Sequence, residues 1–160
     1  MKILVVSDTH RQNENFYRVI EMHHPEMVIH CGDVEGSEEE LIRAAGCPMY
    51  IVSGNNDFFS DLPRELEVEI EGYRVWITHG HHYYVSMGPE QIREEALVRG
   101  VDIVMYGHTH RPVVYRDDEL IAINPGSLSY PRQDGRKPSY IIWEIDRNGE
   151  SHFTIAYLDR

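Results

Sequence analysis

The chain has little cysteine, little lysine and no long apolar run. Its two cysteines, Cys31 and Cys47, are too few for a disulfide framework or a four-cysteine zinc site, which favours reduced thiols and a cytoplasmic protein. With only Lys2 and Lys137 and a net charge of −12, the chain lacks the basic surface that duplex nucleic acid requires. No stretch approaches the ~20 apolar residues of a membrane span, so we expect neither a membrane partner nor a targeting segment.

Histidine, in contrast, is abundant, with ten residues among 160. A chain of this length fits one domain, and no repeat, linker or low-complexity stretch divides it. We therefore expect a single domain over residues 1–160. Histidine is the commonest metal ligand and also an ordinary structural residue, so the positions of the histidines must decide between these roles.

Short apolar runs alternate with amphipathic stretches over the first part of the chain. The pattern predicts strands at 3–6, 27–29 and 49–52, separated by helices at 16–22 and 37–45. This rhythm is typical of βαβ units and a parallel sheet. Ser37 and Glu40 resemble a capping box at the start of the second helix, and Gly46 is placed to end it.

The later part of the chain is richer in β-structure. Expected elements are a hairpin of residues 67–70 and 73–78, a helix at 89–99, a buried strand at 102–106, and strand pairs at 112–116 with 120–123 and 139–146 with 151–157. Turn residues, such as Asn148-Gly149 in the last pair, separate the paired runs. Together these patterns predict one α/β domain with an added antiparallel sheet.

Polar side chains of a few kinds follow the expected strands directly. They are Asp8, His10, Asp33, Asn55, His79, His81, His108 and His110. In open α/β sheets ligands bind beyond the carboxyl ends of the strands, so we expect these side chains to meet at one rim. In an extended segment residues i and i+2 point the same way, which would let Asp8 with His10, and His108 with His110, present two ligands each. The glycines before Asp33, Asn55 and His108 would allow sharp turns or close approach.

The donor set is carboxylate, carboxamide and imidazole, without thiolate. This favours Mn, Fe, Zn, Ni or Co over copper(I), and so many imidazoles suit Mg or Ca less well. Seven donors, counting one of His79 and His81, exceed the four of a tetrahedral zinc ion and suit two metals that share a bridging carboxylate. His79 and His81 are two residues apart and would point the same way in an extended segment. Spacing alone therefore does not indicate which of them binds metal. Arg11 and Arg132 are taken as solvated surface, with contact to substrate phosphate as the alternative, and His30 is taken as hydrogen-bonded core.

Five of these motifs, in chain order, resemble those of the calcineurin-like metallophosphoesterases. They are Asp8-x-His10, Gly32-Asp33, Gly54-Asn55, His79-Gly80-His81 and Gly107-His108-x-His110. The resemblance is greatest to the small single-domain prokaryotic phosphodiesterases, which residues 124–127 also resemble. It implies a four-layer α-β-β-α sandwich of two mixed β-sheets flanked by helices.

The resemblance also implies a role for each residue. Asp8, His10, Asp33 and His110 would hold the first of two divalent ions; Asp33, as the bridge, Asn55, His79 and His108 would hold the second. Manganese is the first expectation, with Ni, Fe, Zn or Co as alternatives. Asp33, Asn55, His79 and His81 would form the catalytic group, with His81 as an outer or substrate contact. Larger relatives carry histidine where this chain has Asn56, which cannot donate a proton as an acid.

These roles predict a phosphodiesterase that hydrolyses a small or exposed phosphoester by attack of a metal-bound hydroxide. The centre would stay positive inside a negative chain and attract phosphate locally. Phosphomonoesterase and pyrophosphatase activities, and a mononuclear zinc hydrolase, are alternatives. So is a protein-interaction platform without catalysis, the role of a retromer subunit in the same superfamily. A homo-oligomer is left open.

Overall fold

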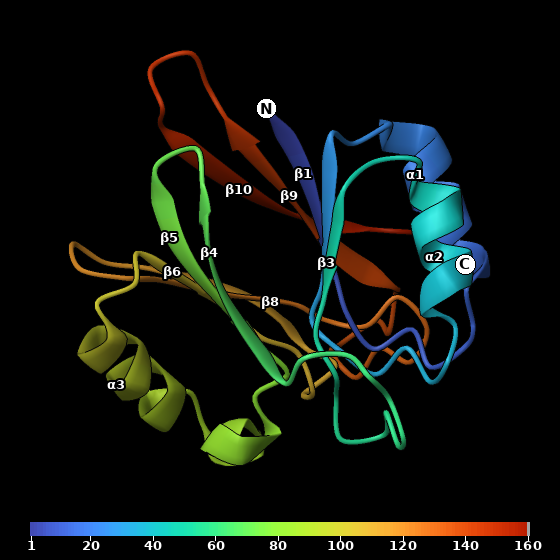
Figure 1. Ribbon diagram of the computed structural model, residues 1–160, viewed down its shortest axis with the longest axis horizontal. Coiled ribbons are helices and arrows are strands. Elements are labelled where there is room, and N and C mark those ends of the chain that lie inside the picture. Colours follow the sequence, from blue (N-terminus) through green and yellow to red (C-terminus); the bar gives the residue numbers. More distant parts are fainter. Residues whose placement is uncertain (160) are drawn as a thin grey trace.

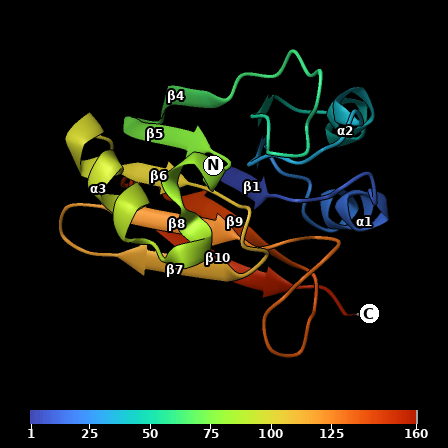
Figure 2. The same cartoon turned by 90° about the horizontal axis from the view of Figure 1, so that it is seen from below.

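Four layers make up the part of the chain that the computed structural model describes, residues 1–159 (Figure 1). Two five-stranded mixed sheets pack face to face. Helices α1 and α2 lie outside one sheet, and α3 lies outside the other (Figure 2). The expected α-β-β-α sandwich is confirmed.

The first sheet has the strand order β10-β9-β1-β2-β3. Its strands are β1 (Lys2–Val6), β2 (Met27–His30), β3 (Met49–Ile51), β9 (Ser139–Ile145) and β10 (Ser151–Tyr157). Strands β1, β2 and β3 run parallel, whereas β9 pairs with β1 antiparallel.

The second sheet has the order β4-β5-β6-β8-β7. Its strands are β4 (Glu65–Ile70), β5 (Tyr73–Thr78), β6 (Ile103–Met105), β7 (Pro112–Arg116) and β8 (Ile121–Pro125). The β4–β5 hairpin is antiparallel as expected, and β5, β6 and β8 run parallel.

The expectation of a separate antiparallel sheet is wrong. The β7–β8 hairpin joins β6 in the second sheet, and the β9–β10 hairpin joins β1 in the first. Without them β1 and β6 would each leave a row of backbone donors and acceptors unpaired at an edge, which a buried strand does not tolerate.

The helices are α1 (Glu14–His23), α2 (Glu38–Ala45) and α3 (Glu90–Arg99), and two short 3-10 turns, His81–Tyr83 and Val85–Met87, follow β5. The capping box before α2 is wrong. The Ser37 hydroxyl donates to the carbonyl oxygen of Val34 at 2.8 Å instead of capping the helix. Gly46 does end α2, with a left-handed φ of 63°.

Alternate side chains of β1 explain how its sheet is buried on both faces. Ile3 and Val5 pack in the apolar cluster between the sheets, whereas Leu4 and Val6 pack in the cluster beneath α1 and α2. A strand covered on both faces is apolar throughout, as this run is. Cys31 is also buried in the core, and neither cysteine forms a disulfide within residues 1–159. Within that range, no helix has the length and apolarity needed to cross a membrane.

Candidate metal centre

Loops at the carboxyl ends of five strands bring together all seven expected metal-binding side chains. Asp8 and His10 follow β1, Asp33 follows β2, Asn55 follows β3, His79 follows β5, and His108 and His110 follow β6. Both sheets therefore contribute to one centre, at the end of the molecule where these loops gather (Figure 1).

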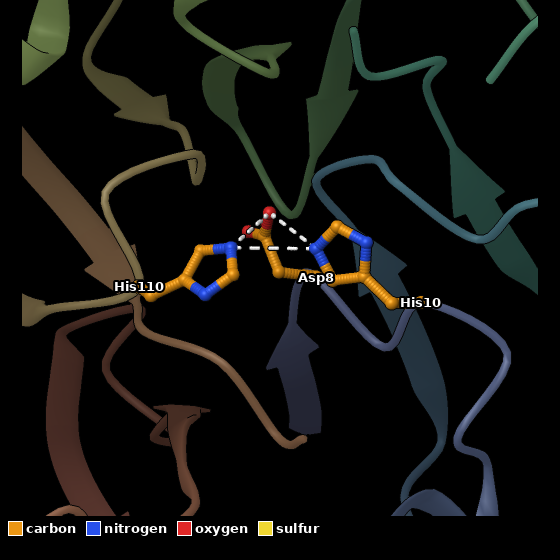
Figure 3. Close-up of side chains that lie close together, drawn as sticks. All are labelled: Asp8, His10 and His110. Atoms are coloured by element: carbon orange, nitrogen blue, oxygen red, sulfur yellow. Dashed lines mark hydrogen bonds and ion pairs between the residues drawn. The ribbon is translucent and has the colours of Figure 1, made fainter. Parts of the chain in front are cut away.

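The first group consists of Asp8, His10 and His110, whose donor atoms lie close enough to hold one ion (Figure 3). His10 and His110 flank the carboxylate. Their Nε2 atoms are 3.3 Å apart and lie 3.6 and 3.1 Å from Asp8 Oδ1. One carboxylate oxygen and two imidazole nitrogens thus point at a common position.

The fit to a cation is clearest at Asp8. Its Oδ2 accepts hydrogen bonds from the Ser7 hydroxyl and the His108 backbone N–H, while Oδ1 is buried and accepts none within residues 1–159. His110 Nδ1 donates to the Tyr130 carbonyl oxygen at 2.7 Å, so Nε2 of the neutral ring carries a lone pair. That lone pair faces Oδ1, and two acceptors facing each other need a cation between them.

The second group is a chain of contacts among Asp33, His79, His108 and Asn55. His79 Nε2 lies 3.3 Å from Asp33 Oδ2 and 3.3 Å from His108 Nδ1, which lies 3.1 Å from Asn55 Oδ1. His79 Nδ1 is 2.7 Å from the Cys31 carbonyl oxygen, which fixes the ring as outer hydrogen bonds fix metal-binding imidazoles.

The two carboxylates set the electrostatics of both groups. Burial alone would lower the pKa of His79, but Asp8 and Asp33 raise it to about 9. Burial likewise works to raise the pKa of Asp8, yet His79, His10 and His110 hold it well below its usual value. Without a metal, a protonated His79 would balance these carboxylates, so metal uptake competes with that proton.

The backbone of the ligand loops differs from the expected extended form. Asp8, His10, Asp33, His108 and His110 have positive φ angles between 48° and 73°. These residues therefore converge through left-handed turns, and the expected i, i+2 alternation of an extended segment is wrong. Non-glycine residues in this region are strained and concentrate at functional sites.

Two glycines are required because the ligands come so close to the backbone. A Cβ at Gly54 would overlap the Asp33 carboxylate, and one at Gly107 would overlap the Ser7 hydroxyl and Asp8 Oδ2. This confirms the expected close approach.

Asp57 holds two ligand loops together, a role that the sequence left open. Its Oδ2 accepts from the backbone N–H groups of Asp33 and Gly54 at 2.8 and 2.7 Å, and its Oδ1 accepts from Glu35 N–H. Asp57 thereby ties the loop after β2 to the loop after β3.

The segment of residues 124–127 positions the other ligand loops. The Asn124 amide donates to the Gly107 carbonyl oxygen and the Thr109 hydroxyl, and the Ser127 hydroxyl donates to the Asp8 carbonyl oxygen. Sequence reasoning gave this segment no role beyond its resemblance. The Asn-Pro-Gly sequence at the end of β8 was the available signal.

Asn56 contacts the proposed bridging carboxylate. Its backbone N–H donates to Asp33 Oδ1 at 2.9 Å and its side-chain amide donates to Oδ2 at 3.1 Å. His81 lies beside the second group, with ring centroids 5.4 Å from His79 and 6.0 Å from His108. Burial, followed by the nearby His79, lowers the pKa of His81 to about 4.

His30 is hydrogen-bonded core, as expected. It is fully buried, its Nδ1 accepts from Gly32 N–H, and its Nε2 lies 3.0 Å from the Thr9 hydroxyl. Arg132 is exposed as expected, and it also lines a cavity beside His10 and His110. Arg11 is exposed as expected and donates to the Glu35 carbonyl oxygen.

Comparison with known proteins gives the same family as the motifs. The family model of the calcineurin-like phosphoesterase superfamily domain matches residues 1–148. The probable metallophosphoesterase YsnB of Bacillus subtilis is 30% identical over 162 residues, covering 100% of this chain and 92% of that protein. A phosphodiesterase of Methanocaldococcus jannaschii is 35% identical over 148 residues, covering 79% of this chain and 83% of the relative.

A solved structure of Vps29 from Entamoeba histolytica in complex with zinc shares the fold. Its TM-score is 0.77 at 21% identity, with 98% of this chain and 99% of that chain covered. Clusters of aspartate and histidine that could hold metal ions, at the strand ends where the motifs place them, accompany these similarities. The chain belongs to the calcineurin-like phosphoesterase superfamily.

Proposed function

We propose that this protein is a dinuclear metal-dependent phosphodiesterase that acts on a small or exposed phosphoester in the reducing cytoplasm. One observation carries the proposal: buried Asp8 Oδ1 accepts no hydrogen bond within residues 1–159 and faces three imidazole Nε2 atoms at 3.1–3.7 Å. The phosphodiesterase name of the archaeal relative supports the choice of a diester.

The proposed ligands divide as the motifs suggest. Asp8, His10 and His110 would hold the first ion, and Asn55, His79 and His108 would hold the second. The position of Asp33 supports its role as the bridge, because its Oδ2 lies 3.6 Å from His10 Nε2 and 3.3 Å from His79 Nε2. Two ions at such a centre activate water and neutralise the charge on the phosphoester.

The remaining residues position these groups. Cys31 and Tyr130 carbonyl oxygens orient His79 and His110, and the Asn56 amide holds the Asp33 carboxylate. We propose His81 as the side chain that contacts the reacting phosphoester, because its ring lies next to both imidazoles of the second group. Oxygen and imidazole donors suit manganese first, with Ni, Fe, Zn and Co as alternatives.

The test is a panel of aryl phosphodiesters and phosphomonoesters, with metal content measured on the same sample. We expect hydrolysis of bis(p-nitrophenyl) phosphate near neutral pH, restored to chelated protein by Mn²⁺, with two ions per chain. Slower hydrolysis of p-nitrophenyl phosphate than of the diester is expected.

The same panel separates the alternatives. Faster monoester hydrolysis would make the protein a phosphomonoesterase, and full activity with one zinc ion would make it mononuclear. No hydrolysis by protein that carries two ions, together with tight binding of a partner protein, would favour an interaction platform on this fold.

A further inference from the structure

A cavity of about 800 Å³ opens beside two ligands of the first group, His10 and His110. Its remaining lining residues are Glu35, Arg111, Tyr130, Pro131, Arg132 and Arg136. Three of these eight residues are arginines in a chain whose net charge is −12. The space next to the metal centre is therefore locally basic, unlike the chain as a whole.

Arg111 and Arg132 are fixed relative to His110 through the backbone. Arg111 follows His110 directly, and its N–H donates to the Thr109 hydroxyl. The N–H of Arg132 donates to the His110 carbonyl oxygen at 3.0 Å, and the Tyr130 carbonyl oxygen accepts from His110 Nδ1. The backbone of both arginines is therefore held in place next to His110, one of the proposed metal ligands.

The guanidinium groups of Arg111 and Arg132 have no hydrogen-bond or ion-pair partner within residues 1–159. Arg99, in contrast, forms ion pairs with Glu65, Glu67 and Glu95. The carboxylate that lines the cavity, Glu35, lies 3.5 Å from His10 Nδ1 and so is directed at the imidazole. The two guanidinium groups are left available to an anion that enters the cavity.

The cavity is large enough for more than one group of a substrate. Small-molecule sites typically measure ~300–1,000 Å³, and a single phosphate fills little of this volume. Guanidinium forks match phosphate oxygens in charge and geometry. A long polyanion is disfavoured by the negative charge of the whole chain.

We propose that Arg111 and Arg132 bind a second phosphate group of the substrate while its scissile phosphodiester lies against the metal centre. This inference rests on the proposed function and narrows its substrate class to a small phosphodiester that also carries a phosphate monoester. The two phosphate groups are recognised separately, the first by the metal centre and the second by the arginines.

Matched substrates test this directly. Thymidine 5′-(p-nitrophenyl phosphate) is compared with the same ester bearing a 3′-phosphate, and kcat/KM for nitrophenol release is measured with Mn²⁺. We expect wild-type protein to prefer the 3′-phosphorylated ester by about tenfold or more, since charge-assisted contacts are strong. Arg111→Gln and Arg132→Gln should each reduce the preference to near unity.

The matched control is Arg147→Gln, which removes an exposed arginine from the turn between β9 and β10. It should leave the preference unchanged. Thermal unfolding of all three variants should match the wild type, because Arg111, Arg132 and Arg147 are all exposed.

A binding measurement keeps the test independent of turnover. Calorimetry compares thymidine 3′,5′-bisphosphate with thymidine 5′-monophosphate on metal-loaded protein, and we expect the bisphosphate to bind about tenfold tighter. If neither ester is hydrolysed but this difference exists and disappears in Arg111→Gln, the arginine site stands and the proposed function fails. Equal binding and equal hydrolysis in wild type and variants would overturn the arginine site and leave the phosphodiesterase intact.

Discussion

Asp33 lies between the two proposed metal sites, and its carboxylate is held by the backbone and side-chain amide of Asn56. Its φ of 65° is left-handed, a conformation that asparagine tolerates at least as well as aspartate but alanine tolerates poorly. Asn is therefore the substitution that removes the charge while preserving the loop.

We predict that Asp33→Asn disturbs both metals and lowers activity by more than the ~10–100-fold that is typical of an outer-shell change. The reason is that one carboxylate would serve both ions. Metal content by elemental analysis and hydrolysis of bis(p-nitrophenyl) phosphate are the measurements. Two ions retained at full occupancy would show that Asp33 is not the bridge.

Asp57 offers a contrasting prediction, because it touches backbone amides rather than the centre. Asp57→Asn should lower activity by ~10–100-fold and destabilise the fold by about 2 kcal/mol, since the amide has only one acceptor oxygen and its nitrogen must face the backbone N–H of Glu35 or those of Asp33 and Gly54. Denaturant unfolding of chelated protein measures the stability, and unchanged stability would contradict this role.

The sequence predicted which side chains gather at the candidate metal centre but not their supporting contacts. Ligand types directly after apolar strands can be recognised locally, as Asp8 and His79 were. The contact of Asn56 with Asp33 and the place of Arg132 beside His110 depend on loops 23 and 22 residues apart. No local pattern encodes such pairs.

At the scale of elements, His30 ends β2 and joins its loop to the loop after β1. Gly32 N–H donates to Nδ1, so the proton of the neutral ring is on Nε2, which donates to the Thr9 hydroxyl. Burial lowers the pKa of His30 to about 4, from an ordinary value of 6.5. The ring is therefore neutral in the folded protein over the physiological range.

This lowered pKa predicts a stability loss in acid. Below pH 6.5 the unfolded chain binds a proton at His30 that the folded chain does not, so the free energy of unfolding falls as pH drops towards 4. The loss reaches about 2 kcal/mol at pH 5. Urea unfolding of chelated wild-type protein and His30→Gln over pH 5–7 measures it, and the variant should show a shallower slope. Parallel pH profiles would exclude His30 as a source of acid sensitivity.

The sequence predicted strands where both faces of the sheet are buried. It also predicted the ends of elements where a glycine marks a turn, as at Glu71-Gly72 and Gly46. The sequence did not predict which sheet each late hairpin joins. That choice depends on the edges that β1 and β6 leave open. The paired residues of β1 and β9, such as Ile3 and Trp143, are 140 positions apart in the chain, and those of β6 and β8, such as Ile103 and Ile121, are 18 positions apart. It also missed the 3-10 turn at His81–Tyr83, whose residues carry no periodic signal.

At the scale of the whole molecule, loops of both sheets meet at the centre. Asp8 from the first sheet contacts His79 and His110 from the second. Ions that bind this centre bind the folded chain and not the unfolded one, so metal should stabilise the entire fold.

The two proposed sites should add this stability unequally. Apart from shared Asp33, the first site has the anionic Asp8, whereas the second has only the neutral Asn55, His79 and His108. The second ion should therefore bind more weakly and leave first under mild chelation.

A hundredfold excess of metal over each Kd adds about 2.7 kcal/mol to the free energy of unfolding, which raises Tm by roughly 5–10 °C for a domain of this size. Thermal unfolding against free Mn²⁺ should show two steps, with activity following the second. Asn55→Asp, which adds a carboxylate to the second site, should draw the steps together, and a single step in the wild type would show that the sites do not differ.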